Sequence, residues 1–228
     1  MSKKDFDKAL SKIPSNKAPD IFFNSVENYR YANERVKEAI RTICNEMLSD
    51  MNKYSSPILS MSTSSFLYKG KGKLRTSPGS YRKLSIGSCI NKIIDCYLAD
   101  TIKLHIRENQ SPLQYGFSQN IDFKQCAVLR ETSVRLNTLN GKTTFITAAD
   151  VSNTFTRTQR ETQKYEMWRT GERLSIYSYS QASYRQTFTV LRNGNEYSEI
   201  ICEECGSKQG GKNSAIEFVA YTTQHGVE

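Results

Sequence analysis

The chain has 228 residues, enough for one sizeable domain or two small domains that share an interface. Hydrophobic residues make up 37% and charged residues 24% of it, a balance that argues against an intrinsically disordered chain. No run approaches the roughly 18 apolar residues of a membrane span, and the first residues lack the apolar core of a secretory signal. We therefore expect an intracellular protein without a membrane segment, and the sequence does not distinguish cytoplasm from nucleus.

The net charge of +9 arises from 32 Lys and Arg against 23 Asp and Glu. A surplus of this size suits a polyanionic partner, most commonly a phosphate backbone, but charge alone is equally compatible with a basic surface that only aids solubility. The six cysteines are too dispersed for a disulfide framework and are interpreted as reduced thiols. Cys202 and Cys205 form a lone CxxC pair without a nearby histidine, which favours strand-end residues over a zinc site.

The first half of the chain predicts helices around one basic hairpin. Residues 33–50 have apolar side chains at helical spacing, whereas the serine-rich residues 51–65 indicate a connecting loop. Residues 66–107 hold nine Lys and Arg against two Asp, and their first part predicts a strand, a glycine-rich turn and a second strand that starts near Tyr81. A capped helix with one apolar side is then expected from Ser88.

The second half predicts helices and strands in alternation. The sequence KTTFITAAD has the β-branched and small residues of a buried strand and ends on an acid. Asn193-Gly194 is a strong hairpin signal, and the glycine-rich loop CGSKQGGKNS follows that hairpin. The expected elements are helices at 122–139 and 158–169 and strands at 142–150, 187–191 and 197–202.

Asp150 carries a chemical signal that is weak when taken alone. A carboxylate at the end of a buried strand is costly unless Arg, Lys or a divalent metal ion pairs with it, and Mg²⁺ prefers carboxylate oxygens. Phe155, five residues later, is expected at the turn that leaves the strand, where its ring could form the wall of a pocket. By itself this pattern is more typical of a helix cap or a salt bridge than of a metal site.

The order of several motifs is more informative than any one of them. From the N-terminus they are NKAP, the basic stretch KGKGKLRTSPGSYRKLSIGSCINKII, QSPLQYGF, AADVSNTF and CGSKQGG. This series resembles the reverse transcriptases, most closely those of LINE-like non-LTR retrotransposons. AADVSNTF is similar to the family's motif A, D-x-x-x-A-F, and CGSKQGG to its motif B, G-x-x-QG. QSPLQYGF resembles its Q-x-GF element, and the basic stretch resembles its YRPISL segment. The resemblance covers nearly all of residues 8–221.

The resemblance implies a right-hand polymerase fold of mixed α/β (α+β) class. It places mainly helical fingers at residues 1–141 and a partial palm, with motifs A and B and a small antiparallel sheet, at residues 142–228. Asp150 is expected to end one strand of that sheet beside the 187–202 hairpin. Its carboxylate is expected within about 15 Å of Gln209, because both residues would line one nucleotide pocket.

The resemblance also implies the roles of individual residues. Asp150, with the main-chain carbonyl of Val151, would bind Mg²⁺ in the two-metal arrangement for phosphoryl transfer. Phe155 matches the aromatic residue that stacks under the sugar and excludes a ribose 2′-hydroxyl, and Gln209 and Gly210 match the motif B loop. The cations expected to hold the incoming triphosphate are Arg82 with Lys69 or Lys73, and those expected to bind nucleic acid are Lys69, Lys71, Lys73, Arg75 and Arg82. The implied partners are an RNA template, an RNA–DNA duplex and deoxynucleoside triphosphates.

The sequence departs from the family's pattern in several places. It contains no Asp-Asp pair, so the aromatic-x-Asp-Asp motif C that should follow motif B is missing, as is the thumb. Thr154 stands where the family favours Ala, and Lys83 replaces the usual Pro. We therefore expect an RNA-directed DNA polymerase domain that is incomplete and inactive as given. The alternatives are a non-catalytic remnant that only binds nucleic acid and a fragment of a group II intron-type enzyme. The NKAP and YRKLSI segments favour the LINE side.

Overall fold

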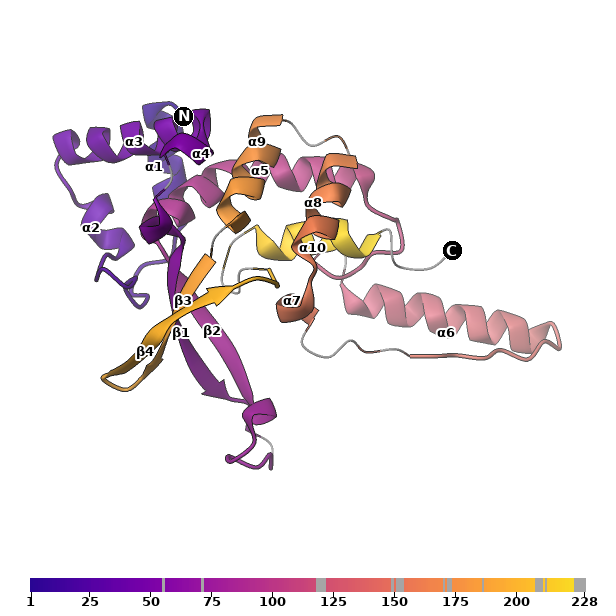
Figure 1. Cartoon of the computed structure of the whole chain (residues 1–228). Helices are drawn as coiled ribbons and strands as arrows, with labels where there is room; N and C mark the ends of the chain where they lie inside the picture. Colours follow the sequence, from indigo (N-terminus) through magenta and orange to yellow (C-terminus); the bar gives the residue numbers. More distant parts are fainter. Residues whose placement is uncertain are drawn as a thin grey trace.

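The protein is a mixed α/β molecule in which a helical body packs beside a small twisted sheet (Figure 1). A computed structural model describes the chain apart from residues 55, 71, 118–121, 149, 151–153, 170, 172–173, 186, 208–210, 212 and 224–228. The helices are α1 (Lys3–Ser11), α2 (Val26–Arg30), α3 (Glu34–Ser49), α4 (Met51–Tyr54), α5 (Cys89–Asn109), α6 (Phe123–Leu139), α7 (Thr154–Arg157), α8 (Arg160–Arg169), α9 (Leu174–Arg185) and α10 (Ser214–Thr223), with short 3-10 turns at Pro57–Ser60 and Pro78–Ser80. The expected α+β class is confirmed.

The sheet joins two hairpins that are far apart in the sequence. Its strands are β1 (Met61–Tyr68), β2 (Tyr81–Gly87), β3 (Thr187–Asn193) and β4 (Glu196–Glu203), and their spatial order is β2-β1-β3-β4. Each hairpin is antiparallel, but β1 pairs in parallel with β3, so the sheet is mixed rather than antiparallel throughout. It therefore connects the region expected to form the fingers with the region expected to form the palm.

The hydrophobic core is organised around the long helix α5. Its apolar side is buried, as the spacing of its isoleucines predicts, and Ile93, Ile94 and Ile102 are fully enclosed. Helices α1, α3 and α10 pack against α5, and α8 and α9 add Met167 and Tyr179 to the same core. The core thus lies on the helical side of the molecule and holds the helices that precede and follow the second hairpin.

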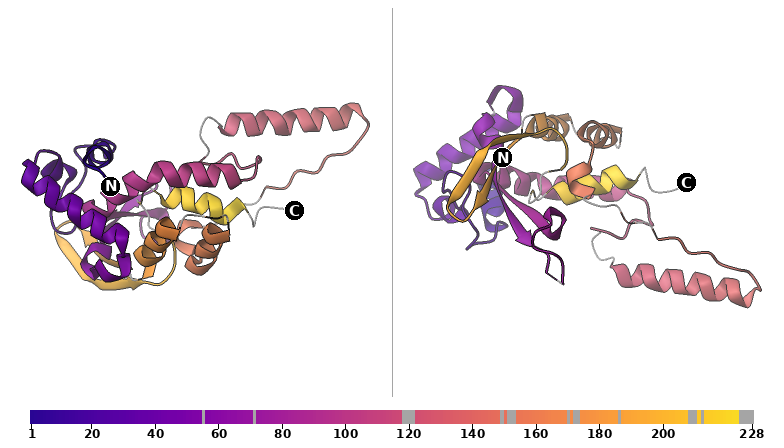
Figure 2. Two further views of the ribbon diagram at one scale, coloured as in Figure 1. Left: turned by 90° about the horizontal axis from the view of Figure 1, so that it is seen from above. Right: turned by 60° about the horizontal axis from the view of Figure 1, so that its bottom comes forward.

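Helix α6 projects away from the rest of the molecule, and residues 142–148 run back alongside it (Figures 1 and 2). The expected helix is confirmed, although none of its residues is buried. The expected strand at 142–150 is wrong for its described residues, which are irregular and largely exposed, with Phe145 91% exposed. The reason is physical, since a strand forms only when a neighbour pairs with it, and none of the described strands lies beside this segment.

The remaining expected elements are mostly confirmed. The helices begin where Asn33, Ser88 and Asp122 cap them, and both predicted hairpins form. The expected loop at 51–65 is wrong in part, because β1 already starts at Met61. Its serines are poor strand formers, but the Ser64 hydroxyl lies 2.7 Å from that of Thr189 on the neighbouring strand. Among the described residues, no helix has the length and apolar character needed to cross a membrane.

Candidate functional site

The segment around Phe155 packs directly against the base of the glycine-rich loop. The amide of Ser207 donates to the Phe155 carbonyl at 2.7 Å, and the amide of Gly206 donates to the Thr158 carbonyl at 2.9 Å. Gly206 has a φ of +86°, and a Cβ atom there would lie 2.9 Å from the Thr156 carbonyl oxygen. Only glycine fits such a close approach of two backbones. The motif A and motif B segments therefore meet through main-chain contacts.

The Phe155 ring lies among aromatic side chains from two other segments. Its centroid is 5.1 Å from that of Phe218 on α10 and 6.1 Å from that of Phe117, which meets it edge-on. Phe117 belongs to the QYGF motif and has a φ of +58°, which turns the chain sharply at that point. Two of the sequence motifs and helix α10 thus come together around one half-buried ring.

Asp150 lies in an irregular, exposed segment and not at the end of a strand. The expectation that it borders the 187–202 hairpin within one sheet is therefore wrong for the described residues, since the strand beside that hairpin is β1. Its predicted neighbours Val151, Gln209 and Gly210 lie outside the described residues, so the expected distance between Asp150 and Gln209 stays a prediction.

The described residues do not by themselves assemble a metal site. Nowhere in the described part of the chain do three His, Cys, Asp or Glu side chains gather closely enough to hold a metal ion. Asp150 supplies one carboxylate, whereas two divalent cations placed close together need several for charge balance. The residues present therefore do not fit a two-metal centre without further ligands.

The basic hairpin formed by β1 and β2 carries four of the five predicted cations in its described residues. The Lys69 ammonium donates to the Gly79 carbonyl at 2.8 Å, and the Arg75 guanidinium stacks 5.0 Å from the Tyr68 ring centroid. Both side chains therefore help to shape the hairpin tip. Lys73 and Arg82 are exposed, and their side-chain cations make no ion pair with the described residues, which leaves them available to an external anion. Lys71 lies outside the described residues.

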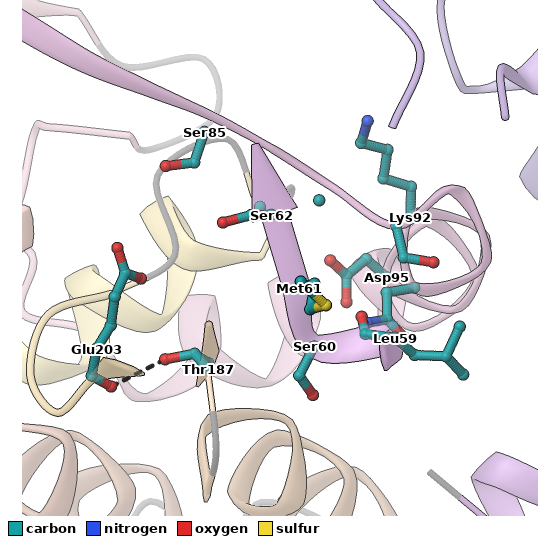
Figure 3. A pocket seen from close by; sticks show the side chains of 13 residues that line it. Leu59, Ser60, Met61, Ser62, Ser85, Lys92, Asp95, Thr187 and Glu203 are labelled. Atoms are coloured by element: carbon teal, nitrogen blue, oxygen red, sulfur yellow. Dashed lines mark hydrogen bonds between the residues drawn. The ribbon is translucent and has the colours of Figure 1, made fainter. Parts of the chain in front are cut away.

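A small pocket opens between the sheet and the start of α5 (Figure 3). It has a volume of about 60 Å³, well below the several hundred Å³ typical of a nucleotide-sized site. Ser62, Ser85 and Thr187 line it from the sheet, and Lys92 and Asp95 line it from α5. The pocket is therefore too small to be the nucleotide site.

Sequence reasoning missed two residues that support the loop base, Arg160 and Gln163 on α8. Arg160 is 9% exposed and Gln163 is 2% exposed. A charged or amide side chain at the start of a polar helix usually faces solvent, so nothing in the local sequence marked either residue as buried. Only the packing of α8 against residues 203–207 shows their role.

Comparison with known proteins identifies a family for most of the chain. No curated protein matches the chain significantly. The profile of one family, described as reverse transcriptase (RNA-dependent DNA polymerase), matches residues 68–225. This match begins in the basic hairpin and includes the Phe155 turn, the second hairpin and the glycine-rich loop, the segments that the fold brings together. The chain belongs to the reverse transcriptase family.

Proposed function

We propose that this chain is the fingers and the front part of the palm of an RNA-directed DNA polymerase from a LINE-like, non-LTR retrotransposon. The observation that supports this most is the main-chain contact between the Phe155 turn and Ser207 at the base of the glycine-rich loop. In a template-directed polymerase these two segments border the incoming nucleotide. The proposed regions are fingers at 1–141 and palm at 142–228.

The proposed roles follow from side-chain chemistry. Asp150, with the Val151 carbonyl, is one ligand of the divalent cations that reverse transcriptases use, and it requires further carboxylates beside it. Phe155 stacks under the deoxyribose and excludes a 2′-hydroxyl. The exposed Arg82 guanidinium, assisted by Lys69 or Lys73, holds the triphosphate through paired N–H donors. Gln209 and Gly210 of motif B contact the template and the incoming nucleotide.

The assignment of Asp150 is tested by completing the palm. Residues 1–221 are joined to the palm end and thumb of a related enzyme that supplies an Asp-Asp pair, and primer extension on RNA is measured with Mg²⁺. We expect extension that Asp150→Asn abolishes, because electrostatic stabilisation of the transferred phosphoryl group depends on the metal ligands. Asp100→Asn is the matched control, since Asp100 is an exposed carboxylate on α5 that pairs with Lys12 at the end of α1. Extension that survives Asp150→Asn would falsify the assignment.

The basic hairpin is expected to supply much of the affinity for RNA. Residues 1–228 should bind RNA or a primer–template duplex with little sequence preference, and the affinity should fall steeply with salt because phosphate contacts release counterions. The double charge reversal of Lys73 and Arg82 should remove most of this affinity. The control reverses Lys4 and Arg35, two exposed cations on α1 and α3, and changes the net charge equally. Equal losses in both variants, or binding that is indifferent to salt, would contradict a hairpin interface.

Residues 1–228 alone are expected to show no nucleotide incorporation on a primed RNA template. They contain no Asp-Asp pair, so Asp150 stands without the carboxylates that two metal ions need. Extension by these residues that is insensitive to Asp150→Asn would show that the site lies elsewhere. Binding without extension in the completed enzyme would favour the remnant that only binds nucleic acid.

A further inference from the structure

Arg160 joins three separate segments at the base of the glycine-rich loop. Its guanidinium donates to the carbonyl of Gly206 at 2.9 Å and to those of Glu203 and Cys205 at 2.6 and 3.2 Å. It also donates to the carbonyl of Tyr184 at 3.2 Å and to the hydroxyl of Thr187 at 2.8 Å. The end of α9, the start of β3 and the end of β4 are thus held by one side chain.

The Arg160 guanidinium is buried, although arginine side chains are rarely buried without a carboxylate partner. In the described part of the chain it bonds carbonyls and one hydroxyl but no carboxylate, and the Tyr184 ring face lies 5.5 Å from its central carbon. A buried charge without an opposite charge is costly, so packing alone would favour an apolar residue. The planar fork of five N–H donors is the feature that no other side chain reproduces.

A second contact from the same helix holds the next residue of the loop. Gln163 lies one turn after Arg160 on α8, and its side-chain oxygen accepts from the Ser207 hydroxyl at 3.0 Å. The amide of Gln163 in turn donates to the buried carboxylate of Glu217 on α10 at 3.2 Å. Residues 206 and 207 are therefore fixed both by the Phe155 turn and by α8.

We propose that Arg160 is the positioning residue for the glycine-rich loop. It fixes residues 203–206, at the base of that loop, against the turn that bears Phe155. This inference rests on the proposed function for the role of that loop. The contacts between Arg160 and residues 203–206 do not depend on that proposal, because they form within residues 1–228.

The direct test is amide hydrogen exchange of residues 1–228 at Gly206 and Ser207, whose N–H groups bond Thr158 and Phe155. Arg160→Lys keeps the charge but places all donors on one nitrogen, so it cannot span the same acceptors. We expect exchange at both amides to rise about ten-fold in Arg160→Lys and further in Arg160→Met. Arg169→Lys is the matched control, because Arg169 lies at the other end of the same helix and a lysine there keeps a cation beside the buried Glu166 carboxylate, which Arg169 bonds at 3.0 Å. Its exchange at the two amides should equal that of the unmodified chain.

Two more variants distinguish the loss of the Arg160 contacts from a loss of overall stability. Met167→Ala removes a fully buried core side chain of α8 and lowers overall stability without touching the loop contacts. Glu203→Gln breaks the ion pair with Lys83 but leaves the Glu203 carbonyl that Arg160 bonds. The proposal is overturned if either variant, compared at equal distance from its unfolding midpoint, raises exchange at the two amides as much as Arg160→Lys does.

The completed polymerase described above supplies the functional measurement. There Arg160→Lys should raise the KM for the nucleotide about ten-fold and change kcat much less, since ground-state placement of the nucleotide is what the loop provides. An unchanged KM in an active Arg160→Lys enzyme would overturn the proposal. If the completed enzyme does not polymerise at all, the proposed function fails, and the exchange experiment still decides whether Arg160 holds the loop.

Discussion

At the scale of single residues, Gly206 shows how a site can depend on the absence of a side chain. A Cβ atom at this position would lie 2.9 and 3.0 Å from the carbonyl oxygens of Thr156 and Phe155, and both of those atoms belong to backbone. Gly206→Ala is therefore expected to separate the turn from the loop base and to lower the free energy of unfolding by more than the ~1–2 kcal/mol of left-handed backbone strain. Urea unfolding measures this loss.

Gly141→Ala is the control for the Gly206 substitution. Gly141 has a φ of +66°, but nothing lies within 4 Å of where its Cβ would be, so its replacement adds backbone strain without a clash. Similar losses for Gly141→Ala and Gly206→Ala would mean that the close approach contributes nothing to stability.

Only the part of the candidate site that lies within the sequence motifs could be predicted from the sequence. Phe155 and the loop after Cys205 were placed together by the order of their motifs, and the structure brings their main chains into contact. Arg160 was missed because its function depends on five acceptors contributed by segments up to 46 residues away. Such a convergence has no local pattern, since it exists only after α8, β3 and β4 have packed.

At the scale of elements, a buried carboxylate ties the N-terminal loop to the start of α5. Asp20 is 5% exposed and accepts from the amides of Phe22 and Asn24 at 3.0 Å and from that of Cys89 at 3.1 Å. Asp20→Ala leaves one buried and two partly buried amide donors unpaired, so we expect the free energy of unfolding to fall by about 3 kcal/mol. Chemical denaturation monitored by circular dichroism would measure it.

An exposed helix cap provides the comparison for Asp20. Asp122 also accepts from two amides, at 2.8 and 3.3 Å, but it caps α6, which buries nothing. Asp122→Ala should therefore cost about 1 kcal/mol or less of global stability. If Asp20→Ala costs no more than Asp122→Ala, the buried carboxylate is not the link between the loop and the helix.

Secondary structure was predictable where local signals and tertiary packing agree. The capped, amphipathic helix α3 and the Asn-Gly hairpin depend on neighbouring residues alone, and both form. The strand predicted over residues 142–148 does not form, because a strand needs a neighbouring strand to pair with and β-branched residues alone do not provide one. Conversely, the serine-rich start of β1 becomes a strand because Thr189 and Ser85 offer hydroxyl partners that no sequence window includes.

At the scale of the whole molecule, buried thiols should make stability depend on alkaline pH. Burial raises the pKa of Cys44 from 9.0 to about 12 and that of Cys89 from 9.0 to about 11. Both pKa values return to their ordinary range on unfolding, so unfolding releases protons above pH 9 and the folded state loses stability as pH rises. The loss should be about 1.4 kcal/mol per thiol for each pH unit until the folded pKa is reached.

Urea unfolding midpoints at pH 7.5 and pH 10 would measure this dependence. Cys44→Ala should reduce the difference between the two midpoints, because one proton-releasing group has gone. Cys126→Ala should leave the difference unchanged, because the Cys126 thiol is exposed in the folded chain. An equal pH dependence in all three proteins would show that other groups control alkaline stability.

The exposed segment after α6 is a place where the chain can be cleaved without separating the two parts of the molecule. Phe145 is 91% exposed, so chymotrypsin should cut there before it reaches the body. The contacts that hold the body together cross this cut, since β1 pairs with β3 and the Asp95 carboxylate of α5 accepts from Tyr179 at 3.0 Å. The nicked protein should stay whole until denatured. Two separately encoded pieces, 1–145 and 146–228, should likewise reassemble when co-expressed, which makes the segment a natural place for a split reporter.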